Sequence, residues 1–218
     1  ALFDLKYMKK LNILVATLMF TFFTSVKAEI QFGLGIIAGQ TDVSGTETEG
    51  TAADTSDRTA DFQEAFVGAD IFVELVQDNG FTYGLSYVPL DIEIGSGSRV
   101  DSDGDDAAEN DDGTRTASAD LSDLITIYAN IPFGGNGFYG LAGYHLVTVS
   151  TAETLNESSY GNEDIQGYQL GIGQRSGNFK YEFAYSDFED INISSTGGGT
   201  NSISANADAL TFRMSYGF

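Results

Sequence analysis

Six charged residues stand at alternate positions of strand-like segments that are otherwise apolar or glycine-rich. They are Asp70, Glu74, Arg175, Lys180, Glu182 and Arg213. Three are acidic and three are basic, and a carboxylate beside a guanidinium or ammonium group forms a charge-assisted hydrogen bond. Because such charges are costly to bury alone, the pattern predicts a paired charge network inside the protein. We expect Glu182 and Arg213 to form a pair that Lys180 and Glu74 extend.

A second group of side chains, in the acidic segment 101–112, alternates as the ligands of a calcium loop do. The candidate ligands are Asp101, Asp103, Asp105, Glu109 and Asp112. Glycine is the fourth residue rather than the sixth, and Asp112 stands where a bidentate Glu is usual, so an EF-hand is not expected. Two interpretations stay open, weak binding of Ca²⁺ or Mg²⁺ and a solvated acidic loop. No other cofactor is expected.

Catalysis is not expected from the remaining residue types. The chain has no cysteine, and its single histidine, His145, lacks a recognisable serine or acidic partner arrangement. Glycines alternate in segments such as 33–35 and 171–173, but no helix follows them, so they do not form a phosphate-binding loop. Close packing inside the protein explains them better.

The composition limits both the partners and the fold. The 218 residues include 26 glycines, only 2 prolines and 12% aromatic residues, which favours one domain of strands and turns. A formal net charge of -22 makes nucleic acid an unsuitable partner. Without disulfides, an exported chain of this kind depends on its hydrogen-bond ladder and on burial, which a closed barrel in lipid supplies.

The first 28 residues predict export. Met8, Lys9 and Lys10 precede an apolar run over 11–26, and small residues then fit cleavage between Ala28 and Glu29. Residues 1–7 are interpreted as upstream read-through, 8–28 as a signal peptide with a helical core, and 29–218 as the mature domain. The alternative is an uncleaved anchor helix.

Eight segments of the mature domain alternate with period two, which predicts β-strands. They cover about 30–39, 63–76, 81–89, 119–132, 138–150, 165–175, 179–186 and 210–218. In the fourth segment we expect Leu121 to share the outward face with Ile125. In the fifth, we expect Tyr139, Leu141, Gly143, His145, Val147 and Val149 to point outward.

The predicted connections alternate in length. Those after the first, third, fifth and seventh segments are long, at about 41–62, 95–118, 151–164 and 189–206, and the others are short. This alternation predicts an all-β, eight-stranded, antiparallel up-and-down transmembrane barrel with both termini in the periplasm. Aromatic residues at the periplasmic ends fit an interfacial girdle: Phe81, Tyr83, Tyr139, Phe179, Tyr181, Tyr216 and Phe218. A soluble β-sandwich is the alternative.

The C-terminal segment Leu-Thr-Phe-Arg-Met-Ser-Tyr-Gly-Phe (210–218) resembles the terminal strand of bacterial outer-membrane barrels. Segment 181–191 is similar to the matching strand of the opacity-type and OmpA-like eight-stranded family. The resemblance implies a bacterial outer-membrane location among lipid and lipopolysaccharide. It also implies that Tyr216 and Phe218 are the signal read by the barrel-assembly machinery.

Two functions from different classes stay open. The first is a structural or surface-interaction role, in which a monomer presents long acidic loops to an unknown extracellular partner or weakly binds divalent cations there. The second is a porin-like narrow channel or a carrier of small solutes, including lateral movement of an apolar molecule. A packed lumen would favour the first, and a continuous water-filled channel the second.

Overall fold

A computed structural model of the chain describes residues 28–51, 54–101, 113–154, 159–196 and 201–218. The strands are β1 (Ala28–Thr51), β2 (Asp54–Gln77), β3 (Thr82–Val88), β4 (Ile92–Asp101), β5 (Gly113–Pro132), β6 (Phe138–Glu153), β7 (Glu163–Ser176), β8 (Phe179–Phe188), β9 (Ile191–Ser194) and β10 (Ser202–Gly217). In these ranges no helix is both long and apolar enough to cross a membrane. Apart from Ala28, the predicted signal segment lies outside the described residues and stays a prediction.

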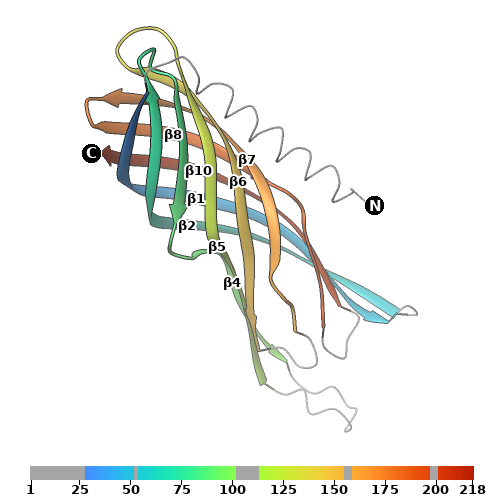
Figure 1. Ribbon diagram of the computed structural model, residues 1–218. Coiled ribbons are helices and arrows are strands. Elements are labelled where there is room, and N and C mark those ends of the chain that lie inside the picture. The colour runs from blue at the N-terminus through green and yellow to red at the C-terminus, as the bar shows by residue number, and fades with distance from the viewer. Residues whose placement is uncertain (1–27, 52–53, 102–112, 155–158, 197–200) are drawn as a thin grey trace.

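The strands form one closed antiparallel ring (Figure 1). Strand β10 pairs with β1 and closes it. Strands β3 and β4 both pair with β5, and are two parts of one barrel strand that is interrupted at 89–91. Strands β8 and β9 both pair with β10, and are likewise interrupted at 189–190. The ring therefore has eight barrel strands, which confirms the predicted fold.

The short turns lie at the end of the barrel that holds Ala28 and Phe218, here called the terminal end. At the opposite end, here called the far end, strands extend into much of the segments 41–62, 95–118 and 189–206 that were expected to be loops. The β1–β2 ladder continues to the pair Thr51–Asp54, and the β4–β5 ladder to Asp101–Gly113. These segments lack apolar alternation, so their hydropathy did not reveal them as strands. Cross-strand hydrogen bonds replace apolar burial, as from Ser44 Oγ to Asp61 Oδ1 at 2.6 Å.

Apolar side chains cover the outside of the barrel. They include Phe32 and Leu34 on β1, Val67 on β2, Leu170 on β7 and Phe183 on β8, all exposed. Exposure of this many large apolar residues in a continuous band is unfavourable in water and favourable in lipid. The protein is therefore a barrel of the outer-membrane type.

Inward-facing aromatic rings lie against glycines of the neighbouring strand. Register pairs Phe72 with Gly33, Tyr128 with Gly84, and Tyr139 with Gly173. A Cβ atom added at any of these glycines would overlap the facing ring. The glycine-rich strands thus make room for rings that fill the lumen, in keeping with the packing explanation given above.

The expected orientation of β6 was wrong. Tyr139, Leu141, His145, Val147 and Val149 are all buried in the lumen instead of facing outward, and Gly143 shares their face. The lumen itself is apolar toward the far end, where Val147 and Val149 belong to a cluster of buried apolar side chains. Both faces of β6 therefore look apolar in sequence, and hydropathy did not distinguish them.

The orientation of Leu121 was also wrong, because a β-bulge in β5 changes the phase of the alternation. The β5–β6 register shifts between Ser122 and Ile125, and Asp123 has a φ of 53°. One extra residue moves every following side chain to the other face. Leu121 therefore points inward and is only 2% exposed.

Three carboxylates face one another on the outside, just beyond the apolar band. Asp208 on β10 is in register with Asp42 on β1 and with Asp187 on β8. Partial burial and these two neighbouring charges raise the pKa of Asp208 above its usual value.

The substitution Asp208→Asn should stabilise the protein at neutral pH by a few tenths of a kcal/mol up to about 1 kcal/mol, since it removes cross-strand repulsion. The folded state binds the Asp208 proton more tightly than the unfolded state does. The unfavourable contribution is therefore present above the raised pKa and is relieved as pH falls through it. Urea unfolding in lipid vesicles at several pH values measures both effects. Asp164→Asn is the control, because Asp164 accepts a hydrogen bond from Thr148 and should gain nothing. Equal gains in the free energy of unfolding for Asp208→Asn and Asp164→Asn would contradict cross-strand repulsion as the cause.

Candidate functional site

The six charged residues predicted to form a network all project into the lumen near the terminal end. Here they are called the charged plug. Arg213 lies between two carboxylates and holds Asp70 in a bidentate pair, with Nη2–Oδ2 at 2.6 Å and Nε–Oδ1 at 3.0 Å. Its Nη1 donates to Glu182 Oε2 at 2.6 Å. The expected Glu182–Arg213 pair is thus present, on the adjacent strands β8 and β10.

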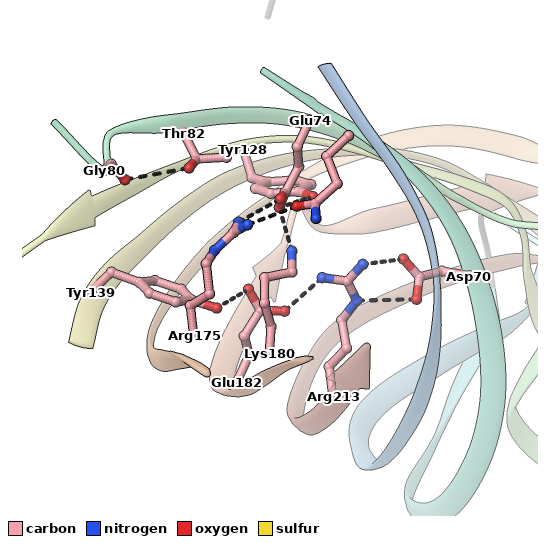
Figure 2. A network of polar contacts seen from close by, with 11 residues as sticks. Asp70, Glu74, Gly80, Thr82, Tyr128, Tyr139, Arg175, Lys180, Glu182 and Arg213 are labelled. Atoms are coloured by element: carbon pink, nitrogen blue, oxygen red, sulfur yellow. Dashed lines mark hydrogen bonds and ion pairs between the residues drawn. The ribbon is translucent and has the colours of Figure 1, made fainter. Parts of the chain in front are cut away.

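Glu74 is the second centre of the plug (Figure 2). It pairs with Lys180 and with Arg175, whose Nη2 lies 2.6 Å from Glu74 Oε2. Two tyrosines that were not predicted as plug residues complete the network. The Tyr128 hydroxyl donates to Glu74, and the Tyr139 hydroxyl donates to Glu182, both at 2.8 Å.

The plug is largely buried and electrically balanced. Asp70, Glu74, Lys180 and Glu182 are each at most 2% exposed. The Phe72 ring lies 4.3 Å from Lys180 Nζ and 4.7 Å from Arg213 Cζ, so it contacts both cations. Three positive and three negative side chains leave no net charge, and each is paired. The arrangement fills this part of the lumen with paired charges and aromatic rings.

A polar layer built on His145 lies beyond the plug. His145 Nδ1 is 2.8 Å from Thr126 Oγ1, and Nε2 is 3.0 Å from Ser186 Oγ. The ring also stacks on Phe188 at 5.4 Å between centroids. Both ring nitrogens are occupied in a buried site, so the arrangement stabilises the wall. Sequence reasoning missed it because the partners are distant in the chain and the phase of β6 was wrong.

The lumen toward the far end holds a cavity of about 370 Å³, here called the apolar cup. Most of its wall surface is apolar, from residues that include Phe62, Ile94, Val149, Ile191, Ile193 and Ala205. Four charged residues also line it: Glu47, Arg58, Arg115 and Glu153. A smaller cavity of about 70 Å³ lies around the His145 layer. Most of the cup comes from segments expected to be loops, so sequence reasoning missed it. The short alternations Ile92–Ile94 and Ile191–Ile193 were the signal available.

Tyr160 lies at the far end of the apolar cup and connects two sides of the barrel. Its hydroxyl donates to Glu47 Oε1 at 2.7 Å on β1, and its backbone N–H donates to Glu153 Oε1 at 2.5 Å on β6. Its side chain lines the cavity and is only 7% exposed. The cup is therefore partly covered at the far end and blocked at the plug.

The other predicted sites have separate locations. Asp101 ends β4, while Asp103, Asp105, Glu109 and Asp112 lie outside the described residues. Across the part of the chain that the structure describes, no group of three or more His, Cys, Asp or Glu side chains is placed to hold a metal ion. Tyr216 and Phe218 point outward at the terminal end, and the Phe218 N–H donates to the Phe32 carbonyl at 2.8 Å.

Comparison with solved structures finds barrels of similar extent and very different sequence. The outer membrane protein AlkL is 10% identical with a TM-score of 0.49, covering 89% of this chain and 93% of its own. OprG from Pseudomonas aeruginosa is 9% identical with a TM-score of 0.48, covering 89% and 99%. The outer membrane protease OmpT from Escherichia coli is 9% identical with a TM-score of 0.46, covering 89% and 99%. No protein-family model and no curated protein sequence matches the chain.

Proposed function

We propose that this protein is an integral protein of the bacterial outer membrane that binds small apolar molecules in the apolar cup. In this proposal the terminal end faces the periplasm and the far end faces outside, as for barrels with short periplasmic turns. The observation that carries the proposal is the cavity of about 370 Å³ with mainly apolar walls. Small-molecule pockets typically have a volume of about 300–1,000 Å³, so one compact hydrocarbon would fit.

The charged plug supports binding in the cup over ion conduction. A conducting lumen needs unpaired groups or water along its whole length, and the plug fills its half with paired charges and rings. The narrow-channel alternative therefore has less support than the carrier alternative. A molecule that buries about 200 Å² of apolar surface in the cup would gain about 5 kcal/mol, before the entropy lost on binding.

Replacing Ala205 with phenylalanine should take up part of the apolar cup and lower binding at least about tenfold, which corresponds to about 1.4 kcal/mol. Ala205 is buried on β10 and lines the cavity. An alkyl diazirine photoprobe in lipid vesicles measures occupancy, since mass spectrometry locates the labelled residues. In the unchanged protein we expect labelling of cup residues such as Ile94 and Val149, in addition to the outer wall.

The matched control is Ala142→Phe, the same substitution on the lipid-facing side of β6, where Ala142 is in register with the exposed Leu170. Cup labelling should persist in this variant. Labelling confined to the outer wall of the unchanged protein would refute the proposal, and so would equal cup labelling in Ala205→Phe and Ala142→Phe.

Surface recognition is the second candidate function. The β1–β2 ladder carries exposed polar pairs far beyond the apolar band, as from Thr48 Oγ1 to Asp57 Oδ1 at 2.8 Å. A rigid hairpin of this kind is a suitable surface for recognition. If it acts in adhesion, Ala205→Phe should leave binding of cells to host surfaces unchanged.

We also propose that lipid and lipopolysaccharide surround the apolar band. In the same proposal, Tyr216 and Phe218 are the signal that the barrel-assembly machinery reads.

A further inference from the structure

Charged side chains gather at the far end of the apolar cup. The cavity is lined there by Glu47 on β1, Arg58 on β2, Arg115 on β5 and Glu153 on β6, here called the cup rim. Strand β6 runs toward the far end, so Glu153 lies four residues beyond Val149, which lines the apolar wall deeper in the cup. The cup therefore has an apolar interior and a charged rim.

Basic residues are few in this chain, and their distribution is uneven. Residues 29–218 contain six, of which three belong to the charged plug. The other three are Arg58, Arg99 and Arg115. Arg99 on β4 is in register with Arg115 on β5, so the β4–β5 ladder sets two arginines opposite each other. Like charges at directly opposite positions destabilise a sheet, and a bound anion would remove that cost.

The two glutamates of the cup rim already accept hydrogen bonds from Tyr160. Its hydroxyl donates to Glu47 Oε1 at 2.7 Å, and its backbone N–H donates to Glu153 Oε1 at 2.5 Å. A guanidinium has several N–H donors in a planar fork, so an arginine that forms one ion pair still has N–H groups for a second acceptor. Arg58 is exposed and Arg115 is half-buried, so both are within reach of an entering ligand. The cup rim can therefore take an anionic group while Tyr160 keeps its contacts.

An amphipathic molecule suits both regions of the cavity. Its hydrocarbon chain would leave water for the apolar wall, and a carboxylate at its end would accept charge-assisted hydrogen bonds from the arginines. A hydrocarbon without a head group would use the apolar wall alone. A cationic head fits less well, because it would meet the guanidinium groups of Arg58 and Arg115 where both glutamates are engaged by Tyr160.

We propose that the ligand of the apolar cup is an amphipathic anion, a single hydrocarbon chain that ends in a carboxylate. The chain lies against the apolar wall, and the carboxylate lies at the cup rim, where Arg58 and Arg115 donate to it. The inference rests on the proposed function, because the chain occupies the same cavity, and it adds the chemical class and the orientation of the ligand. From Val149 to Glu153 the wall extends about 13 Å along the strand, which suits a chain of medium length such as that of decanoate.

Competition between molecules with the same chain and different head groups tests the inference. The alkyl diazirine photoprobe reports occupancy of the cup in lipid vesicles, and the competitors are decanoate, decanol and decylammonium. Each competitor partitions into lipid to its own extent, so the quantity compared between variants is the ratio of decanoate affinity to decanol affinity. We expect Arg58→Gln combined with Arg115→Gln to lower this ratio at least tenfold and to leave competition by decanol unchanged. The affinity for decylammonium should rise in the same variant.

The matched control is Arg58→Lys with Arg115→Lys, which keeps both positive charges and should keep most of the preference for decanoate. Glu47→Gln with Glu153→Gln removes the negative charges of the cup rim and should raise the ratio. An unchanged ratio in Arg58→Gln/Arg115→Gln, with decanol still displacing the probe from the cup, would overturn the anionic ligand and leave the proposed function standing. A cup that the probe does not label in the unchanged protein would overturn both.

Discussion

Replacing Arg213 with alanine should destabilise the folded protein by about 3–5 kcal/mol, because the substitution leaves two buried carboxylates without their cation. Arg213 pairs with both Asp70 and Glu182, whose exposures are 2% each. A buried carboxylate that loses its paired cation costs far more free energy than removal of the whole pair does. Urea unfolding of the protein in lipid vesicles measures the loss.

Two further variants separate charge from geometry. Arg213→Lys keeps the positive charge but cannot form the bidentate pair with Asp70, so its loss should be smaller than that of the alanine variant. Arg213→Met combined with Asp70→Asn and Glu182→Gln removes all three charges and should recover much of the stability. A loss below about 1 kcal/mol for Arg213→Ala would contradict the interpretation of the plug as a buried, fully paired network. Planar-bilayer recordings of Arg213→Ala test whether this residue also blocks ions, since unchanged conductance would count against that role.

Replacing Gly84 with alanine should be nearly as damaging, at about 3 kcal/mol. The added Cβ would overlap the Tyr128 ring, which has no space to move in a filled lumen. A displaced ring would also withdraw the Tyr128 hydroxyl from Glu74, 2.8 Å away, and so remove a hydrogen bond to a buried carboxylate. The same unfolding assay measures the effect.

Gly140→Ala is the matched control. Gly140 is also in a barrel strand, β6, yet an added Cβ there would meet nothing within 4 Å. Its substitution should change stability by no more than about 0.5 kcal/mol. Similar losses in the two variants would show that strand glycines matter for backbone reasons rather than for the space they leave to the rings.

Apart from the orientation of β6, the sequence was sufficient to predict the membrane-embedded strands and the six charged residues of the plug. On strands such as β8, large apolar residues that face lipid alternate with Lys180 and Glu182, which face the lumen. Hydropathy therefore alternates strongly along such a strand. The short turns also set the height of each residue along the barrel. Counting residues from the short turns places Glu182 and Arg213 at similar heights on adjacent strands.

The far end could not be predicted in the same way, for two physical reasons. The lumen there is apolar, so the hydropathy of Val147 and Val149 on β6 did not distinguish the inner face of the strand from the outer face. Beyond the lipid, the outer face is polar, so segments such as 41–51 and 202–209 had no continuous apolar face that marked them as strands. The bulge at Asp123 also changes the phase within β5, and hydropathy does not reveal a bulge.

Three irregularities follow one another around the wall along the strand register: the break at 89–91, the bulge at Asp123 and the break at 189–190. Paired residues connect them from strand to strand, from Val88 to Leu124 on β5 and from Leu146 on β6 to Gln166 on β7. The backbone N–H of Glu189 then donates to the Gln166 carbonyl. The irregularities divide the molecule into a regular cylinder and a less regular crown. The crown can therefore tolerate a change of sequence or length without disturbing the cylinder, whose regular ladder and apolar outer face suit it to the membrane.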